Sequence, residues 1–192
     1  MVIDDPVRAI GLPGIDPELS EAGVGRMVVL RPWRDGDAGD LVAAWADPEI
    51  RRWTAVPEPA DLKAARRWIA GWDERRRRRL ALDLVAADPA DDRVLGEVGL
   101  SSFDDDRSAA RIGWWTAPGE RGRGVATAMV AAMTAWAHAR PLGLQAVVAE
   151  VDEANPASLV VAHRAGYRPL ERPSGTARVT AAPLLVSWAG AS

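Results

Sequence analysis

The stretch GERGRGVA, residues 119–126, decides how the rest of this chain is interpreted. It places three glycines and two arginines within eight residues, directly before an alanine-rich run that has the pattern of a helix. The residues before it, 110–116, have the composition of a strand. A strand, a glycine-rich turn and a helix in this order bring backbone N–H groups to the positive end of a helix dipole, which is where proteins bind anions. The stretch therefore predicts a phosphate site.

Within this loop, Gly122 and Gly124 would let the backbone approach a ligand without a Cβ in the way, and Arg121 and Arg123 would attract negative charge. Two better-known phosphate motifs do not fit. The chain has no G-x-x-x-x-G-K-[ST] sequence, and a dinucleotide fingerprint would need a small residue where Thr127 stands. Taken alone, these residues leave a solvated glycine-rich turn open as the alternative.

Outside the loop, the chain alternates between strand and helix patterns. A helix at 125–139 leads into a strand at 144–151, and neighbouring parallel strands require such a helical connection. The other predicted elements are strands at 27–33, 80–87, 93–100, 110–116, 167–170 and 181–188, and helices that begin near Asp37, Asp61 and Asn155. The pattern predicts an α/β (α+β) fold with a mixed, mostly antiparallel sheet of about six or seven strands and about four helices.

Length and composition favour one domain. The 192 residues are 48% hydrophobic, which suffices for a full core. Residues 1–26 carry scattered glycine and proline without periodicity, so we expect an irregular arm there and a single domain over residues 27–192.

The charge balance argues against a nucleic-acid partner. The chain has 24 basic and 27 acidic residues, without the basic surface that such proteins need. Arg75–Arg79 is a local exception, but five consecutive side chains point all round a helix, so we interpret them as a solvated helix end. An acidic substrate stays open for this cluster.

No metal, membrane or secretion signal is predicted. There is no cysteine and there are only two histidines, so metal ligands are scarce. The longest weakly polar run, 125–139, is shorter than the ~20 apolar residues that cross a bilayer, and the N-terminus lacks the features of a signal peptide. We expect a cytoplasmic protein.

Three segments together resemble the GCN5-related N-acetyltransferase (GNAT) superfamily and, within it, the RimJ/RimL-like branch of ribosomal-protein-type acetyltransferases. The R-x-x-G-x-A sequence at 121–126 matches the pyrophosphate loop of the superfamily. N-x-x-S at 155–158, followed by G-Y at 166–167, matches its second motif, and L-R-P-W at 30–33 is similar to the opening strand of the branch. The resemblance extends over residues 27–170, most of the chain.

The resemblance implies a GNAT fold with a central splayed pair of parallel strands and acyl-CoA bound in the wedge between them. It implies transfer of acetyl from acetyl-CoA to a primary amine of a small molecule or peptide, by direct attack in a ternary complex and without a metal. It assigns the coenzyme to the strand residues Trp115, Thr116 and Ala117, to the loop residues Arg121, Gly122, Arg123, Gly124, Val125 and Ala126, and to Asn155 and Ser158.

The catalytic base has two candidates. Glu150 stands at the end of a strand, where ribosomal-protein acetyltransferases carry a catalytic glutamate, and burial there would raise its pKa. Its alternation with apolar neighbours equally fits a solvent-facing strand residue. Glu97 is the reserve candidate, acting through water, and the oxyanion would be bound by backbone N–H near Trp115.

The catalytic acid is where the sequence departs from the family. Ala162 stands where many members have a tyrosine that protonates the leaving thiolate. Ser158, four residues earlier and on the same helix face, is the remaining hydroxyl. The resemblance implies that it is the acid, because a serine at this place has that role in RimL-like enzymes. A structural role for Ser158 is the alternative. Asn155 is expected both to cap the helix and to contact the coenzyme.

The amine acceptor stays open. In this superfamily the acceptor site is shaped by the region that here contains Trp45, Trp53, Trp68 and Trp72, although tryptophan at helical spacing also serves as core. An N-terminal amine, a free amino acid, a polyamine and an aminoglycoside are all candidates, and a homodimer is left open.

Two rival functions also stay open. One is an inactive acyl-CoA-binding or regulatory module. The other is a transferase for a bulkier acyl-CoA such as succinyl-CoA, whose extra carboxylate would pair with Arg111, Arg164 or the 75–79 cluster.

Overall fold

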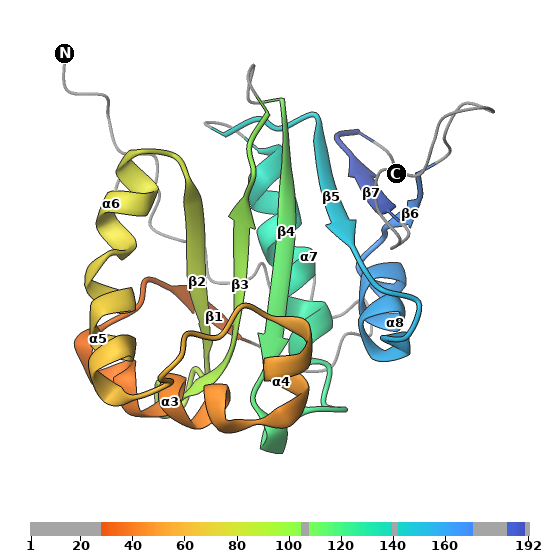
Figure 1. Cartoon of the computed structure of the whole chain (residues 1–192). Helices are drawn as coiled ribbons and strands as arrows, with labels where there is room; N and C mark the ends of the chain where they lie inside the picture. The colour runs from red at the N-terminus through yellow and green to blue at the C-terminus, as the bar shows by residue number, and fades with distance from the viewer. Residues whose placement is uncertain (1–27, 105–107, 140–141, 171–183, 191–192) are drawn as a thin grey trace, which may run out of the picture.

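The protein was analysed as a computed structural model that describes residues 28–104, 108–139, 142–170 and 184–190. Seven strands form one sheet in the order β1-β2-β3-β4-β5-β7-β6, which confirms the predicted sheet of six or seven strands (Figure 1). The strands are β1 (Val29–Arg31), β2 (Ala81–Ala87), β3 (Val94–Ser101), β4 (Ala109–Thr116), β5 (Ala146–Glu150), β6 (Arg168–Pro169) and β7 (Leu184–Trp188). The arm predicted at 1–26 lies outside the described residues, and the single domain predicted over 27–192 stays a prediction.

The four predicted helices are present, together with two short ones. They are α3 (Ala38–Ala46), α5 (Leu62–Ala70), α7 (Val125–His138) and α8 (Pro156–Arg164), joined by α4 (Pro48–Trp53), α6 (Trp72–Arg77) and the 3-10 turns η1 (Asp35–Asp37) and η2 (Pro118–Glu120). Pro48 follows the end of α3 and begins a further helix. It occupies the first turn of α4, where its missing N–H costs nothing, and Asp47 caps that helix by accepting the Ile50 N–H at 2.9 Å.

Helix α3 begins after Asp37, as predicted, but the Asp37 side chain makes no capping hydrogen bond to it. Its carboxylate accepts two hydrogen bonds from the buried Arg31 guanidinium, at 2.8 and 2.9 Å, and one from the Arg34 N–H at 2.8 Å. A buried arginine needs such a bidentate partner, so Asp37 fixes β1 to the turn that follows it.

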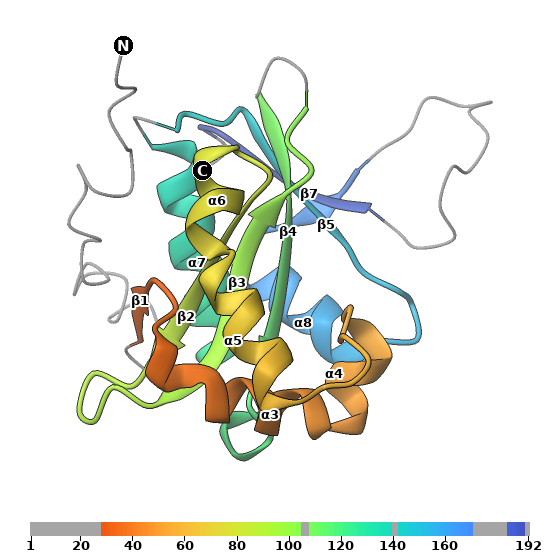
Figure 2. The same ribbon diagram turned by 60° about the vertical axis from the view of Figure 1, so that its left-hand side comes forward.

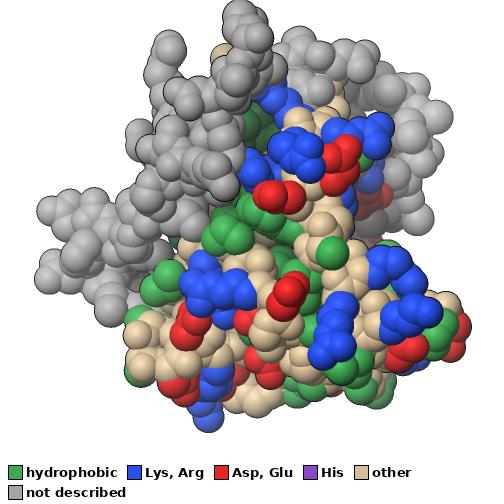
Figure 3. All heavy atoms as spheres, turned by 90° about the vertical axis from the view of Figure 1, so that its left-hand side faces the viewer, with side chains coloured by type: hydrophobic (Ala, Val, Ile, Leu, Met, Phe, Trp, Pro, Cys, Tyr) green, Lys and Arg blue, Asp and Glu red, His purple; other side chains and the backbone are tan. Residues whose placement is uncertain are grey.

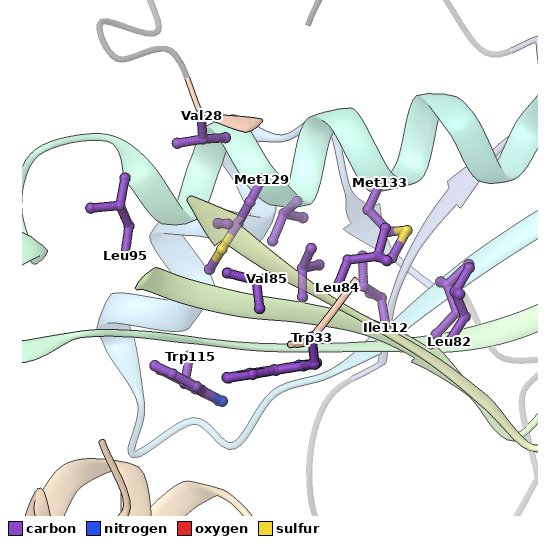
Figure 4. Close-up of a cluster of buried hydrophobic side chains, with 14 of the residues drawn as sticks. Val28, Trp33, Leu82, Leu84, Val85, Leu95, Ile112, Trp115, Met129 and Met133 are labelled. Carbon is purple, nitrogen blue, oxygen red and sulfur yellow. The ribbon is translucent and has the colours of Figure 1, made fainter. Parts of the chain in front are cut away.

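Helices cover the two faces of the sheet. In Figure 1, α7 crosses behind the central strands, and in Figure 2, α5 and α6 lie on the opposite, front face along β2. Met129 and Met133 of α7 pack against one face of the strands, whereas Trp33 and Trp115 lie on the other side (Figure 4). The alternation of side chains along each strand thus builds one core on each face.

The central parallel strands β4 and β5 diverge. Their pairing covers only Ala109 to Arg111 on β4, opposite Ala146 to Val148 on β5. Beyond this point β4 keeps β3 as its partner up to Thr116, and the end of β5 pairs with β7. The gap opens toward the carboxyl ends of both strands, as Figure 1 shows, so the predicted splayed pair is confirmed.

The arginine run at 75–79 is only partly the solvated helix end that the sequence suggested. The guanidinium of Arg75 lies 4.3 Å from the centre of the Trp68 ring, and that of Arg76 lies 5.1 Å from the Trp72 ring. Arg77 extends into solvent and pairs with Glu74 at 2.9 Å. Basic and acidic side chains are interspersed on this side of the molecule (Figure 3). The first two arginines of the run pack on tryptophan rings, so the run does not form one solvated basic surface.

Candidate active site

Two adjoining cavities occupy the region where β4 and β5 diverge. We call the first the loop cavity; it measures about 440 Å³ and is lined by the glycine loop, the end of β4 and the start of α8. The second, the acid cavity, measures about 680 Å³ and is lined by Asp83, Glu97, Glu150 and Asp152 together with aromatic side chains. The cavities share six lining residues, namely Trp53, Thr54, Trp114, Trp115, Asn155 and Ser158. The two cavities therefore adjoin along this shared wall.

The loop cavity ends at the N-terminus of α7. Gly122 and Gly124 adopt positive φ angles of 73° and 83°, a backbone conformation that favours glycine, and Gly124 is the residue before the helix. The helical hydrogen bonds begin with the Ala128 N–H to the Gly124 carbonyl, at 3.0 Å. The N–H groups of residues 125–127 therefore have no partner within the helix, and all three residues line the cavity. This geometry is the one that an anion site needs, and anion binding here stays a prediction.

Arg121, Arg123 and Ala117 are placed differently from one another. Arg121 lines the loop cavity and donates to Asp47 of the α4 cap at 2.6 Å. Arg123 is exposed, 3.6 Å from Glu120, and is not among the described lining residues. Ala117 is also absent from the lining, and its N–H donates to the Leu95 carbonyl at 2.9 Å. Of these three predicted coenzyme contacts, the structure brings only Arg121 to the cavity.

The backbone of β4 presents alternate amides to the open gap. The bond between the Ala117 N–H and Leu95 sets the alternation, because facing residues of an antiparallel pair exchange hydrogen bonds at every second position. Trp115, which faces Glu97, therefore directs its N–H and C=O to β3. Trp114 and Thr116 direct theirs away from β3, into the gap. The amides of Trp114 and Thr116 thus flank Trp115 on the open edge, and an oxyanion donor near Trp115 stays a prediction.

Glu97 is the most perturbed acid of the acid cavity. Its Oε1 accepts the indole N–H of Trp115 at 3.2 Å. The Trp33 indole also acts on this carboxyl, and both indoles lower its pKa, although Trp33 Nε1 and Glu97 Oε2 are buried without a hydrogen bond of good geometry among the described residues. Burial raises the pKa of Glu97 to about 8, and the negative charge of Asp83 adds to this effect. Burial also raises the pKa of Asp83, although Arg75 opposes the shift. Glu97 thus has the properties of a general base that works near neutral pH.

Glu150 lines the same cavity in a different state. Its Oε2 accepts from the Arg111 guanidinium at 2.7 Å, and about a quarter of its side chain (24%) is exposed. The buried base that the sequence suggested at this position is therefore found as an ion pair.

Helix α8 carries the two polar residues that the sequence singled out. Asn155 caps the helix by accepting the Ser158 N–H at 3.1 Å, as predicted, and both residues line both cavities. Ala162 is fully buried and offers no hydroxyl. Tyr167, also buried, has its hydroxyl 2.6 Å from that of Thr134. Ser158 is the α8 hydroxyl at the site, and its role as the acid stays a prediction.

The tryptophans divide between the cavity and the core. Trp45, Trp53 and Trp68 line the acid cavity, although Trp45 is only 5% exposed. Trp72 lines neither cavity; its indole N–H donates to the Asp83 carbonyl, and its ring is buried under Arg76. Of the four tryptophans that the sequence placed near the acceptor site, Trp45, Trp53 and Trp68 thus lie at the acid cavity, and Trp72 packs behind it against β2.

Sequence reasoning missed three residues at the site: Asp47, Asp83 and Trp114. Asp83 had a signal, because it is the only charged residue in the strand ALDLVAA. A lone carboxylate on a strand with buried neighbours implies a functional or ion-paired position. Asp47 and Trp114 had no such signal, because their importance depends on contacts between distant segments.

The described residues contain no group of three or more His, Asp or Glu side chains placed to hold a metal. In the described ranges, no helix has the length and apolar character needed to cross a membrane.

Residues 27–168 match the family model described as acetyltransferase (GNAT) domain. No curated protein matches the chain. The fold is similar to RimL, a ribosomal-protein α-N-acetyltransferase solved with coenzyme A, at a TM-score of 0.72 and 15% identity, covering 88% of this chain and 98% of that one. It is also similar to RimJ of Mycobacterium smegmatis with a CoA disulfide (TM-score 0.68, 23% identity, 85% and 83% covered). A third similar structure is the microcin self-immunity acetyltransferase MccE with acetyl-CoA and AMP (0.70, 16%, 86% and 94%).

Proposed function

The chain belongs to the acetyltransferase (GNAT) family, and we propose that it transfers the acetyl group of acetyl-CoA to a primary amine by direct attack in a ternary complex. The family confirms the predicted enzyme class. The observation that carries the proposal is the position of the α7 N-terminus: residues 125–127, whose N–H groups have no partner within the helix, line the loop cavity where β4 leaves β5.

The coenzyme would lie along the loop cavity. Its pyrophosphate would accept hydrogen bonds from the amides of residues 125–127, with the Arg121 guanidinium beside it. Its pantetheine arm would run along the open edge of β4, where the backbone groups of Trp114 and Thr116 face the gap. Asn155 and Ser158 flank this path from α8. The thioester would then arrive where the two cavities meet.

Glu97 is the base in this proposal, in preference to Glu150. Glu97 is buried without an arginine bonded to it among the described residues and has a pKa of about 8, whereas Glu150 is paired with Arg111. The amine gives its proton to Glu97 and its nitrogen bonds to the thioester carbonyl carbon. The amide of Trp114 stabilises the resulting oxyanion.

Collapse of the intermediate breaks the carbon–sulfur bond and releases coenzyme A. The leaving thiolate takes a proton from the hydroxyl of Ser158, which regains one from solvent. The second proton of the attacking nitrogen passes to solvent as the amide forms, and Glu97 releases its proton to solvent, so that an ammonium ion and a thioester give one amide, one thiol and one net proton.

The charges around the acid cavity favour acetyl over succinyl as the acyl group. An extra carboxylate on the donor would need a cationic partner near the thioester. Arg111 is engaged with Glu150 at 2.7 Å, and Arg75 is bonded to Asp83 and to the Trp68 carbonyl. Arg164 lines the loop cavity, on the coenzyme side.

Two measurements test the proposed function. Calorimetric titration with coenzyme A should give a saturable site, and acetyl-CoA should release thiol when a panel of primary amines is added. Absence of coenzyme A binding would contradict the proposal outright. Binding together with no thiol release for any amine class would favour the regulatory module instead.

A further inference from the structure

The wall of the loop cavity contains a buried carboxylate beside the place proposed for the pyrophosphate. Glu120 ends the turn η2 and lines this cavity together with Gly122, Gly124 and residues 125–127. Its side chain is only 8% exposed. A carboxylate in a wall that receives phosphate repels the ligand, and burial strengthens the repulsion because less water and salt screen it. Such a site needs the charge of Glu120 to be offset.

The guanidinium of Arg93 contacts this carboxylate directly. Arg93 Nη1 donates to Glu120 Oε1 at 2.6 Å, across 27 residues of sequence. The guanidinium of Arg123 lies 3.6 Å from the other oxygen, Oε2, beyond hydrogen-bonding distance. The charge-assisted hydrogen bond, which is the stronger of these two contacts, thus comes from outside the glycine loop.

The turn between β2 and β3 holds Arg93 in place. Its Nε donates to Asp91 Oδ2 at 3.2 Å and its Nη2 to Asp88 Oδ2 at 3.1 Å. The Asp88 N–H donates to the Arg93 carbonyl at 3.0 Å, which closes the turn. Every nitrogen of the guanidinium therefore donates to a carboxylate, and Arg93 is not among the described residues that line the loop cavity. It can influence a ligand of that cavity through Glu120.

The same turn is fixed to the sheet on its other side. Asp92 accepts from Arg31 Nε at 2.7 Å, and its carbonyl accepts from Arg31 Nη2 at 3.0 Å. Arg31 is buried and is bonded in turn to Asp37 at 2.8 and 2.9 Å. The position of Arg93 is thus set by the sheet rather than by the glycine loop, so its charge is in place before a ligand arrives.

We propose that Arg93 is a positioning residue for the coenzyme, because it offsets the negative charge of Glu120 so that the glycine loop can receive a diphosphate. The inference rests on the proposed function, since the diphosphate is that of coenzyme A. Arg93 needs no contact with the coenzyme in this role. Its bond to Glu120 also ties the loop to the start of β3, next to the bond between the Ala117 N–H and the Leu95 carbonyl.

Removal of the arginine is the first test. Arg93→Met takes one positive charge from beside Glu120, so the Kd of coenzyme A in calorimetry should rise roughly 10-fold. Arg77→Met is the matched control, because it removes the same charge from an exposed ion pair with Glu74, 2.9 Å long and outside both cavities. The control should leave the Kd within about 2-fold of the wild type. An Arg93→Met protein that binds coenzyme A as tightly as the wild type would overturn the inference.

A double variant separates charge from shape. Arg93→Met combined with Glu120→Gln lacks the arginine and the carboxylate that it offsets, and the bond between β3 and the loop is lost as well. The Kd of coenzyme A should return to within roughly 3-fold of the wild-type value, because the repulsion is gone. A double variant that binds as weakly as Arg93→Met would show that Arg93 maintains the shape of the loop, which overturns the inference on charge.

Two single variants keep the test decisive if Arg93→Met folds poorly. Arg93→Lys retains the positive charge, so its Kd for coenzyme A should stay within roughly 3-fold of the wild type. Glu120→Gln removes the negative charge and keeps an oxygen that accepts from Arg93, so it should bind coenzyme A as tightly as the wild type or more tightly. A 10-fold weaker affinity in either variant would overturn the inference.

Failure of the proposed function has a different signature. A wild-type protein that does not bind coenzyme A at all would contradict the proposed function and this inference with it. A wild-type protein that binds coenzyme A, together with an Arg93→Met variant that binds it equally well, would overturn the inference alone.

Discussion

Asp47, which caps helix α4, is ion-paired with Arg121 of the glycine loop, with Arg121 Nη2 and Asp47 Oδ1 2.6 Å apart. The same hydrogen bond lowers the pKa of Asp47, so the pair stays charged over the physiological range. Helix α4 also carries Trp53, which lines both cavities. The loop that would hold pyrophosphate is therefore connected directly to the helix that borders the acceptor cavity.

Neutralising this pair should strengthen coenzyme binding. In Asp47→Asn, Arg121 loses its competing carboxylate and becomes available to the pyrophosphate, so we expect the Kd of coenzyme A to fall by up to about 5-fold, the strength of an exposed ion pair. Calorimetric titration at two salt concentrations checks this. Asp61→Asn is the control, because Asp61 caps α5 by accepting the Ala64 N–H at 2.7 Å and forms no ion pair with the loop. A weaker coenzyme affinity in Asp47→Asn would show that Asp47 positions Arg121 for the ligand.

The activity should depend on the protonation of Glu97. Because burial and Asp83 raise the pKa of Glu97 to about 8, kcat/KM should rise with pH and level off above this value. Glu97→Gln should lower kcat by roughly 10²–10⁴-fold and remove that pH dependence. The comparison variant is Glu150→Gln, which breaks the ion pair with Arg111 and should keep the rise near pH 8. If Glu150→Gln abolished the rise and Glu97→Gln did not, the assignment of the base would be reversed.

The raised pKa of Glu97 should also make the stability of the folded protein fall as the pH rises. The folded protein keeps a proton on Glu97 up to a pKa of about 8, whereas the unfolded chain releases it near the ordinary value of 4.5. Unfolding therefore releases a proton between these values, and raising the pH destabilises the native state. The Tm of Glu97→Gln should exceed that of the wild type increasingly from pH 5 to pH 8, with no further change above. A constant Tm difference across this range would contradict the raised pKa.

The features that could be predicted from the sequence are local ones. Helix α8 follows from Asn155, Pro156 and Gly166, because cap, first turn and terminus are fixed by neighbouring residues. The glycine loop follows for the same reason, since positive φ at Gly122 and Gly124 depends only on their own chemistry. Both segments resemble one family, in the order in which that family has them, and this resemblance is the reason why a splayed pair of parallel strands was predicted.

The features that the sequence did not predict depend on contacts between distant strands. The surroundings of Glu97 and Glu150 depend on where Asp83 and Arg111 lie on the neighbouring strands. The hydrophobic pattern of a single strand does not tell which residues of the next strand lie opposite it. Arg75 was expected in solvent because a run of arginines resembles a solvated face. Its stacking on Trp68 is a tertiary contact that composition does not encode.

The glycine loop gives a test that separates ligand binding from stability. Gly124→Ala forces a side chain into a positive φ of 83°, and Gly143→Ala does the same at 61° in the turn before β5. Both substitutions should lower stability by a similar amount, about 1–2 kcal/mol. Only Gly124→Ala should also weaken coenzyme A binding, because the strain falls on the amides at the α7 N-terminus. Equal coenzyme A affinities of the two variants in calorimetry would contradict the assignment of the anion site.

The role of Ser158 as the acid is tested by separating binding from turnover. Ser158→Ala keeps the backbone N–H that Asn155 accepts at 3.1 Å, so the cap of α8 and the shape of both cavities should survive. We expect an unchanged coenzyme A Kd together with a roughly 10- to 100-fold lower kcat, because the leaving thiolate loses its proton donor. Ser101→Ala is the matched control, since Ser101 lines the acid cavity but not the loop cavity. A Ser158 variant with normal kcat would mean that the thiolate leaves unprotonated, and the hydroxyl would then be structural, as it is in many helix first turns.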